Sequence, residues 1–172
     1  GCELPKRRGK RGGQTLALVA GQGRPDERPV LTLTHRPAEP RRMAKVIHSM
    51  IRVLDLERSL KFYADVLDLH ESHRVDFPDF ALVYLRNEDN DFEIELTLNK
   101  GREEAYTHGS GYGHVGVVVP DVDATRAELM GKGYEPAAVK EFNCGSELLA
   151  RFFFIQDPDG YKIEMLERHG HY

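Results

Sequence analysis

Apolar and polar positions follow the same order in two stretches of the chain. VIHSMIRVLDLERSL, residues 46–60, and GYGHVGVVVPDVDATRAEL, residues 111–129, each run from an apolar segment to an aspartate and then to an amphipathic segment. That order predicts a strand followed by a capped helix. His48 opens the first apolar run and His114 opens the second, 66 residues later, so the chain contains an internal repeat.

Each copy of the repeat predicts a strand, a helix and three more strands. The helical stripe of the first copy, which Asp55 is placed to cap, consists of Leu56, Leu60, Tyr63 and Leu67. The three later strands of this copy are expected near 71–76, 79–86 and 91–99. The second copy predicts a strand at 114–119, a helix at about 121–131 and strands near 134–140, 148–156 and 160–167. The expected fold is therefore α+β, with two βαβββ modules at about 43–100 and 110–168.

Alternation along the strands places histidines and glutamates on corresponding faces. FEIELTLN at 92–99 aligns with YKIEMLER at 161–168, so that Glu95 corresponds to Glu164 at an offset of 69 residues. The apolar face of each strand has to meet the helix. The four side chains expected to face away from the helices, into a cavity, are His48, Glu95, His114 and Glu164.

This set of two imidazoles and two carboxylates suits a divalent metal ion. A lone strand histidine is more often a surface or hydrogen-bonded residue, and a lone strand glutamate is usually solvated. Recurrence at matching repeat positions favours a metal site instead. Neutral imidazole suits Ni, Co, Zn or Fe, two carboxylates balance the charge of the ion, and four protein ligands on an octahedral ion leave two positions for substrate oxygens.

Arg52 and Asn99 are expected to point into the same cavity, because they alternate with the apolar positions of their strands. A substrate carboxylate would pair with the guanidinium of Arg52. The alternative for Arg52 is an internal ion pair, for example with Glu93. His73 and His108 do not share the repeat pattern and are expected to be solvated.

Charge divides the chain at residue 42. Residues 1–42 hold 10 Lys/Arg against 4 Asp/Glu, whereas residues 43–172 hold 14 against 24. The first segment is rich in Gly, Pro and Arg and has no sustained period, so we expect a disordered basic arm or a non-native extension, with Met43 as the natural start. A nucleic-acid tail and an export signal are weaker interpretations of this arm.

Composition excludes a membrane protein and a disulfide-rich one. The 172 residues are 40% hydrophobic and 30% charged, and no apolar stretch approaches the roughly 18 residues that cross a bilayer. The two cysteines, Cys2 and Cys144, have no CxxC spacing. We therefore expect a cytoplasmic protein with neither a membrane nor a nucleic acid as partner.

Residues 43–168 resemble the glyoxalase I (lactoylglutathione lyase) family of the vicinal oxygen chelate superfamily. The resemblance is carried by HSMIRVLDLERSLKFYADVL, IELTLNKG, GYGHVGVVVPDV and FIQDPDGYKIEML. It implies that His48, Glu95, His114 and Glu164 are the metal ligands. It also implies a homodimer in which each site takes two ligands from each chain. The short connection from the second strand to IELT resembles the form that prefers nickel or cobalt, although zinc is also compatible.

The resemblance implies isomerisation of the methylglyoxal–glutathione hemithioacetal to S-lactoylglutathione, a detoxification of methylglyoxal. Glu164 would be the catalytic base and Glu95 its near-symmetric partner. Arg52 and Asn99 would bind the γ-glutamyl end of glutathione. Residues 139–153 lack the Lys- and Gly-rich loop common in the family. Lys140 is the candidate that would take the place of this loop in binding the glycine end.

Other activities remain open at this point. An acyl-thioester epimerase of the same superfamily could use the same proton chemistry. An iron dioxygenase needs two histidines and one glutamate, and the fourth ligand, Glu95, argues against it. A metal-free small-molecule binding or resistance protein would need no set of four ligands.

Overall fold

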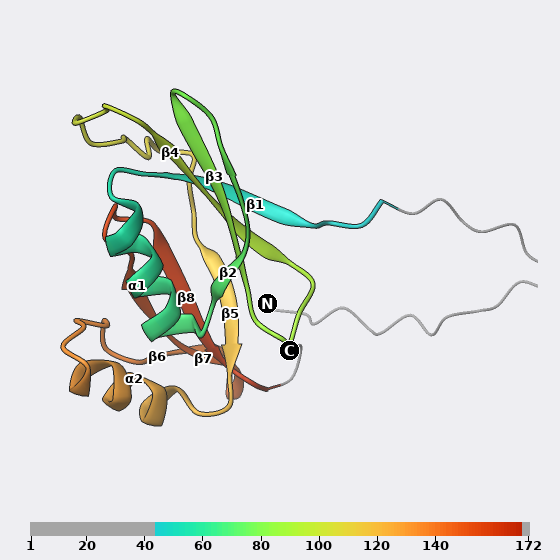
Figure 1. Ribbon diagram of the computed structural model, residues 1–172. Coiled ribbons are helices and arrows are strands. Elements are labelled where there is room, and N and C mark those ends of the chain that lie inside the picture. Colours follow the sequence, from blue (N-terminus) through green and yellow to red (C-terminus); the bar gives the residue numbers. More distant parts are fainter. Residues whose placement is uncertain (1–43, 170–172) are drawn as a thin grey trace, which may run out of the picture. The chain divides into compact units, whose positions relative to one another are not determined.

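The structure, a computed structural model, describes residues 44–169; the predicted arm at 1–42 lies outside this range. Two copies of one element order follow each other along the chain (Figure 1). The first copy consists of β1 (His48–Val53), α1 (Leu56–Leu67), β2 (His70–Asp76), β3 (Phe80–Arg86) and β4 (Glu93–Asn99). The second consists of β5 (Val115–Val119), α2 (Val122–Gly131), β6 (Lys140–Cys144), β7 (Glu147–Gln156) and β8 (Lys162–Glu167). The predicted α+β fold of two βαβββ modules is confirmed.

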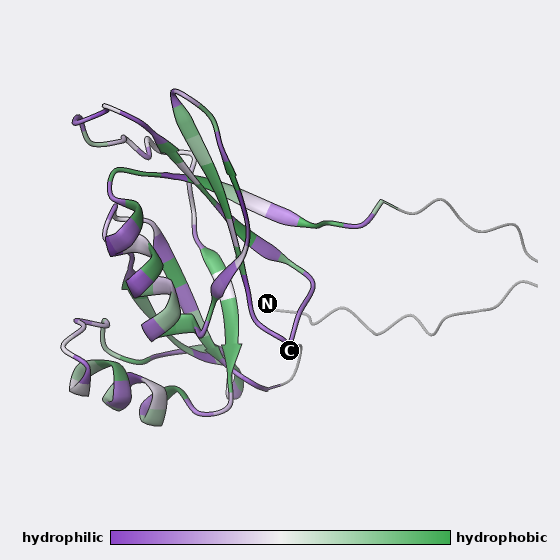
Figure 2. Cartoon of the chain, in the orientation of Figure 1, coloured by the Kyte–Doolittle hydropathy of each residue, from purple (hydrophilic) through white to green (hydrophobic). Residues whose placement is uncertain are grey.

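Each module forms one four-stranded sheet of the same topology. The strand orders are β1-β4-β3-β2 and β5-β8-β7-β6. The first and last strands of each module pair in parallel, β1 with β4 and β5 with β8, and the other neighbours are antiparallel. This pairing brings the histidine at the start of each module beside the strand that carries the module's glutamate. β5, with the sequence VGVVV, is hydrophobic along most of its length (Figure 2).

Helix α1 begins at the predicted cap and packs the predicted stripe against the core. Asp55 accepts a hydrogen bond from the amide of Arg58 (3.0 Å), which satisfies a free N–H of the first turn. Leu56 and Tyr63 of the stripe are buried, and Leu60 and Leu67 are partly buried against the core. The buried face also includes Ser59, Phe62 and Val66, which the predicted stripe left out.

The two modules share one apolar core. Its members include Ile51 and Leu96 from the first module and Leu129 and Phe153 from the second. The rings of Phe62 on α1 and Tyr134 after α2 meet edge to face, with centroids 5.6 Å apart. The Tyr134 hydroxyl donates to the Asp65 carboxylate (2.7 Å). Burial first, and then this carboxylate, raise the pKa of Tyr134 to about 12.

The strand predicted near 134–140 is wrong, because β6 begins only at Lys140. Pro136 has no amide hydrogen to contribute to a strand ladder. Ala137 donates its amide to the carbonyl of Phe154 (2.8 Å), which ties the segment to the edge of β7. The segment before β6 is therefore held beside β7 by this bond without forming a strand.

The two helices of residues 44–169 are 12 and 10 residues long. Neither has the length and apolarity that crossing a membrane requires.

Candidate metal centre

The first histidine and glutamate lie next to each other on neighbouring strands. His48 opens β1, and its Nε2 is 3.2 Å from Oε2 of Glu95 on β4. The side chain of Glu95 is 10% exposed and that of His48 is 36% exposed. Both lie on the face away from α1, as predicted, while Ile51 and Leu96 point into the core.

The second pair repeats this geometry in the second module. His114 directly precedes β5, and its Nε2 is 3.1 Å from Oε2 of Glu164 on β8. Gly116 lies opposite Glu164 in the parallel register. The side chain of Glu164 is 16% exposed and that of His114 is 42% exposed. The offset found in the sequence therefore corresponds to a repeated arrangement of side chains.

The donor atoms of each pair fit one metal ion. Two ligands that lie at right angles, each about 2.1 Å from an ion, are about 3.0 Å apart. Both measured separations, 3.2 and 3.1 Å, are close to this value. An imidazole nitrogen and a carboxylate oxygen are ligands for Ni, Co and Zn.

The four predicted ligands form two pairs rather than a single cluster. Within residues 44–169, no group of three or more His, Cys, Asp or Glu side chains is placed to hold a metal ion. Each module thus provides half of the predicted set.

An aromatic side chain that the sequence analysis missed lies beside each pair. The rings of His48 and Tyr84 meet at 71°, with centroids 5.8 Å apart. Those of His114 and Phe154 meet at 65° and 5.4 Å. Tyr84 and Phe154 are 70 residues apart, so the repeat offset could have identified them. His73 is exposed, as expected, and its ring stacks on that of Tyr84 with centroids 6.0 Å apart.

His108 was expected to be solvated, but its ring lies among aromatic side chains. Its ring stacks on Tyr161, with centroids 4.2 Å apart, and it lies 5.7 Å from the ring of Tyr112. Its Nε2 is buried and lacks a hydrogen-bond partner among the described residues. The flanking glycines suggested an open loop, and only the tertiary contacts reveal the stacking.

Two of the three candidate substrate contacts, Arg52 and Asn99, lie on the strands of the first pair, and the third, Lys140, lies on β6. Arg52 is exposed, and the alternative ion pair with Glu93 does not form: Glu93 accepts from Ser72 (2.6 Å) and its cationic partner is Arg86 (4.0 Å). Asn99 donates to the hydroxyl of Tyr106 (2.8 Å). Lys140 is exposed at the start of β6, opposite Phe152.

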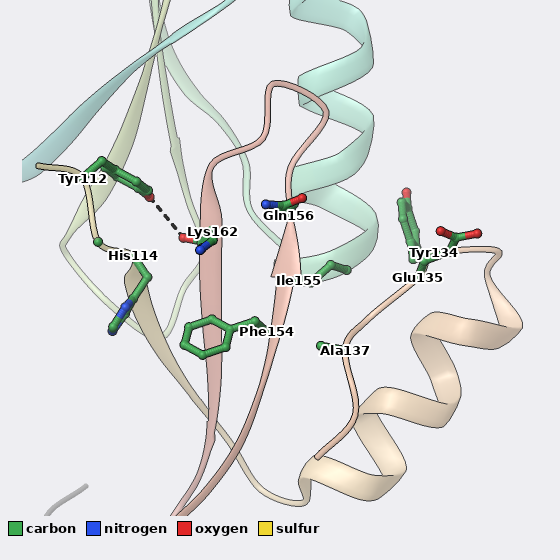
Figure 3. Close-up of a pocket in the computed structure, with 10 residues that line it drawn as sticks. Tyr112, His114, Tyr134, Glu135, Ala137, Phe154, Ile155, Gln156 and Lys162 are labelled. Atoms are coloured by element: carbon green, nitrogen blue, oxygen red, sulfur yellow. Dashed lines mark hydrogen bonds between the residues drawn. The ribbon is translucent and has the colours of Figure 1, made fainter. Parts of the chain in front are cut away.

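A pocket of about 670 Å³ adjoins the second pair (Figure 3). His114 and Phe154 form part of its wall. Its other lining residues are Tyr112, Gly113, Tyr134, Glu135, Ala137, Ile155, Gln156 and Lys162. Lys140 does not line this pocket, and the cationic side chain that does is Lys162.

Known proteins are similar to this chain in sequence and in fold. The lactoylglutathione lyase of Haemophilus influenzae is 40% identical over 131 residues, which are 72% of this chain and 92% of that protein. A probable lactoylglutathione lyase of Synechocystis sp. is 37% identical over 130 residues, 71% of this chain and 94% of the relative.

Solved structures of glyoxalase I enzymes agree with these relatives. The trypanothione-dependent enzyme of Leishmania major has a TM-score of 0.59 at 32% identity, covering 73% of this chain and 87% of that one. Glyoxalase I of Zea mays has a TM-score of 0.64 at 28% identity; the match covers 73% of this chain but 45% of the maize chain. The family model described as Glyoxalase/Bleomycin resistance protein/Dioxygenase superfamily matches residues 45–165. Since that match spans most of the chain, the chain belongs to the glyoxalase/bleomycin resistance protein/dioxygenase superfamily.

Proposed function

We propose that this protein is a lactoylglutathione lyase, glyoxalase I, which isomerises the methylglyoxal–glutathione hemithioacetal to S-lactoylglutathione. The observation that carries the proposal is the repeated histidine–glutamate pair, with separations of 3.2 and 3.1 Å at corresponding positions of the two modules. The names of the relatives from Haemophilus influenzae and Synechocystis support the same activity.

His48, Glu95, His114 and Glu164 would hold one divalent ion, nickel or cobalt in preference and zinc as an alternative. When bound, the ion would act as a Lewis acid for the negative charge that develops on two adjacent substrate oxygens. The histidines present Nε2 on the faces away from the helices, where a substrate can reach them. The aromatic rings of Tyr84 and Phe154 lie against the imidazoles of the two pairs, edge to face.

A homodimer would complete each site, because one chain keeps its two pairs apart. Each site would then combine His48 and Glu95 of one chain with His114 and Glu164 of the other. Large apolar side chains on the pair-bearing faces support such an interface: Met50 and Val118 are each 40% exposed. The maize chain, of which this chain covers 45%, is long enough to contain two such units.

Glu164 would move the proton. Its carboxylate would take the proton from the carbon that carries the sulfur and return it to the neighbouring carbon. The hydroxyl proton of the first carbon moves to the carbonyl oxygen of the second, so the first carbon becomes the thioester carbonyl and the second carries a C–H and a hydroxyl, with no atom gained or lost. Glu95, on the other side of the substrate, is the second candidate for this transfer.

Arg52 and Asn99 would bind the γ-glutamyl end of the substrate, and Lys140 the glycine end. A guanidinium pairs with a carboxylate through two parallel hydrogen bonds, for which the exposed Arg52 is free within residues 44–169. A cytoplasmic location belongs to the same proposal, because that compartment keeps glutathione reduced.

The test is a metal-reconstitution assay with an E164Q variant. Metal-free protein is supplied with Ni, Co or Zn and assayed with methylglyoxal and glutathione by thioester absorbance. We expect E164Q to lower kcat by about 100- to 10,000-fold, because a general base contributes that range, and KM to change little. E147Q, which alters an exposed carboxylate at the start of β7, is the matched control and should keep its activity. A wild-type protein that is inactive with every ion would refute the proposal.

A further inference from the structure

The two histidine–glutamate pairs have the same geometry but differ in the residue opposite each glutamate. In the antiparallel registers, Tyr84 on β3 lies opposite Glu95, and Phe154 on β7 lies opposite Glu164. Each ring also meets the histidine of its own pair edge to face. Tyr84 and Phe154 therefore occupy equivalent positions, and the chemical difference between them is one hydroxyl.

A second hydroxyl distinguishes the pairs two residues further along each strand. Thr97 on β4 donates from Oγ1 to Oε1 of Glu95 (3.3 Å). The equivalent residue on β8 is Leu166, which is buried and has no polar side-chain atom. The first carboxylate thus has hydroxyls at two positions where the second has apolar groups.

The placement of Tyr84 supports this difference. Its half-buried side chain lies directly opposite Glu95 across the two strands. Among residues 44–169, the polar contact of the Glu164 side chain is with His114 alone. Glu95 is consequently the more restrained of the two carboxylates.

We propose that Tyr84 and Thr97 are positioning residues that hold Glu95 in one orientation as a permanent metal ligand. Phe154 and Leu166 leave Glu164 without such restraint, so that it can turn away from the ion and carry the proton. This inference rests on the proposed function and adds to it the cause of the asymmetry between two otherwise equivalent carboxylates. Hydroxyl groups that donate to an ionised carboxylate form stronger bonds than neutral pairs do.

The test measures the release of metal in addition to turnover. Cobalt-loaded protein is mixed with an excess of chelator, and the loss of the cobalt absorbance is followed over time. Y84F and T97V should each release cobalt about tenfold faster than wild type, because each removes a hydroxyl group from the surroundings of the charged Glu95 carboxylate. F154Y adds the missing hydroxyl beside Glu164 and should slow the release and lower kcat several-fold, while KM stays within about twofold. The thermal unfolding midpoints of the metal-free variants control for general loss of structure.

The outcomes separate this inference from the function on which it rests. Release at the wild-type rate from Y84F and T97V, together with full kcat in F154Y, would overturn the inference while the wild type remains an active metalloenzyme. A wild-type protein that retains no cobalt would overturn the proposed function, and the inference with it.

Discussion

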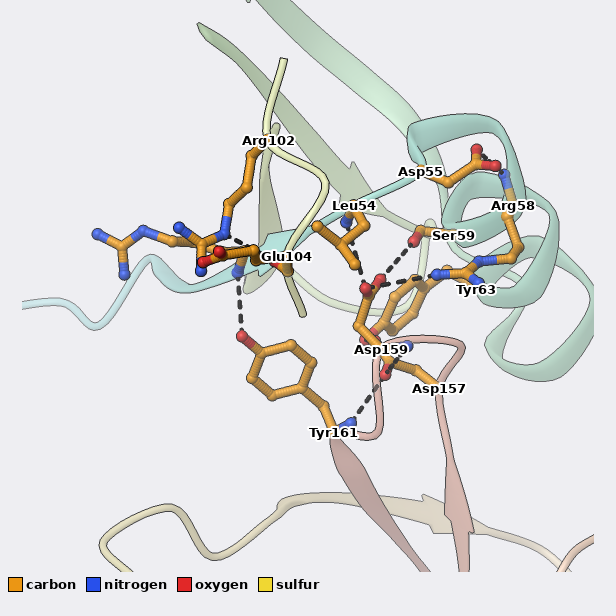
Figure 4. Close-up of polar contacts among 11 residues, drawn as sticks. Leu54, Asp55, Arg58, Ser59, Tyr63, Arg102, Glu104, Asp157, Asp159 and Tyr161 are labelled. Carbon is orange, nitrogen blue, oxygen red and sulfur yellow. Dashed lines mark hydrogen bonds and ion pairs between the residues drawn. The ribbon is translucent and has the colours of Figure 1, made fainter. Parts of the chain in front are cut away.

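At the residue scale, two carboxylates of the turn between β7 and β8 join the modules (Figure 4). Asp159 accepts hydrogen bonds from the amide of Leu54 (3.2 Å) and from the hydroxyl of Ser59 (3.5 Å). Asp157 accepts one from the hydroxyl of Tyr63 (3.0 Å). Ser59 is buried because it faces this turn, which explains the polar residue on the buried face of α1.

Asp157 should make stability depend on pH. Burial raises its pKa above the usual 3.8, although bonds from the amides of Tyr161 and Asp159 and the hydroxyl of Tyr63 oppose the shift. The folded state therefore holds a proton that the unfolded state releases, and stability is lost as pH rises from about 4 through the raised pKa. We expect the free energy of unfolding of wild type to fall relative to that of D157N over this interval, by at most about 1.4 kcal/mol per pH unit.

Urea denaturation of both proteins at a series of pH values measures this difference. The D157N substitution keeps a side-chain acceptor for the two amides but removes the titrating group, so the comparison isolates the carboxyl of Asp157. Parallel pH profiles for wild type and D157N would contradict the prediction.

At the element scale, helix α2 depends on its N-terminal cap more than α1 does. It buries two residues, Val122 and Leu129, whereas α1 buries five. Oδ1 of Asp121 accepts from the amides of Asp123 and Ala124, each at 2.9 Å. These bonds satisfy free N–H groups of the first turn, which packing alone would not.

D121A should therefore lower the free energy of unfolding by about 1 kcal/mol, the usual effect of removing an N-cap side chain. D121N should have a much smaller effect, because asparagine caps helices about as well as aspartate. Chemical denaturation followed by circular dichroism gives both values. Equal losses for the two variants would mean that the charge of Asp121, and not its capping bonds, stabilises α2.

At the scale of the whole molecule, the separation of the two pairs predicts complementation between inactive variants. In the proposed homodimer, H48A and H114A should each lack a complete site. In a mixed dimer, one site would contain both substitutions and the other would be intact. Random exchange of equal amounts should therefore restore about a quarter of wild-type activity and metal content, since half the dimers are mixed and each has one site of two.

Unfolding and refolding the two variants together, followed by metal analysis and assay, measures this recovery. Variants refolded separately and then assayed as a mixture are the control and should stay inactive. Failure of the co-refolded mixture to recover would mean that all four ligands of a site come from one chain.

Much of the candidate site could be predicted because the side on which a strand residue lies is a local property. Alternation alone assigned His48, Glu95 and Glu164 to the faces away from the helices, and the repeat offset matched the two modules. The same reasoning failed at 134–140, where Pro136 has no amide hydrogen to offer a strand ladder, and it left out Ser59 of α1, which is buried against a turn 100 residues away.

By itself, the sequence determined the two βαβββ modules, their helix caps and the faces of the predicted ligands, since each depends on neighbours a few residues apart. Only the tertiary structure decided that the four predicted ligands form two pairs within one chain. It alone also revealed that Tyr84 and Phe154 stand opposite the two glutamates and that His108 stacks on Tyr161. These features depend on strand pairing and on the packing of one module against the other, which join residues far apart in the chain and leave no periodic signal.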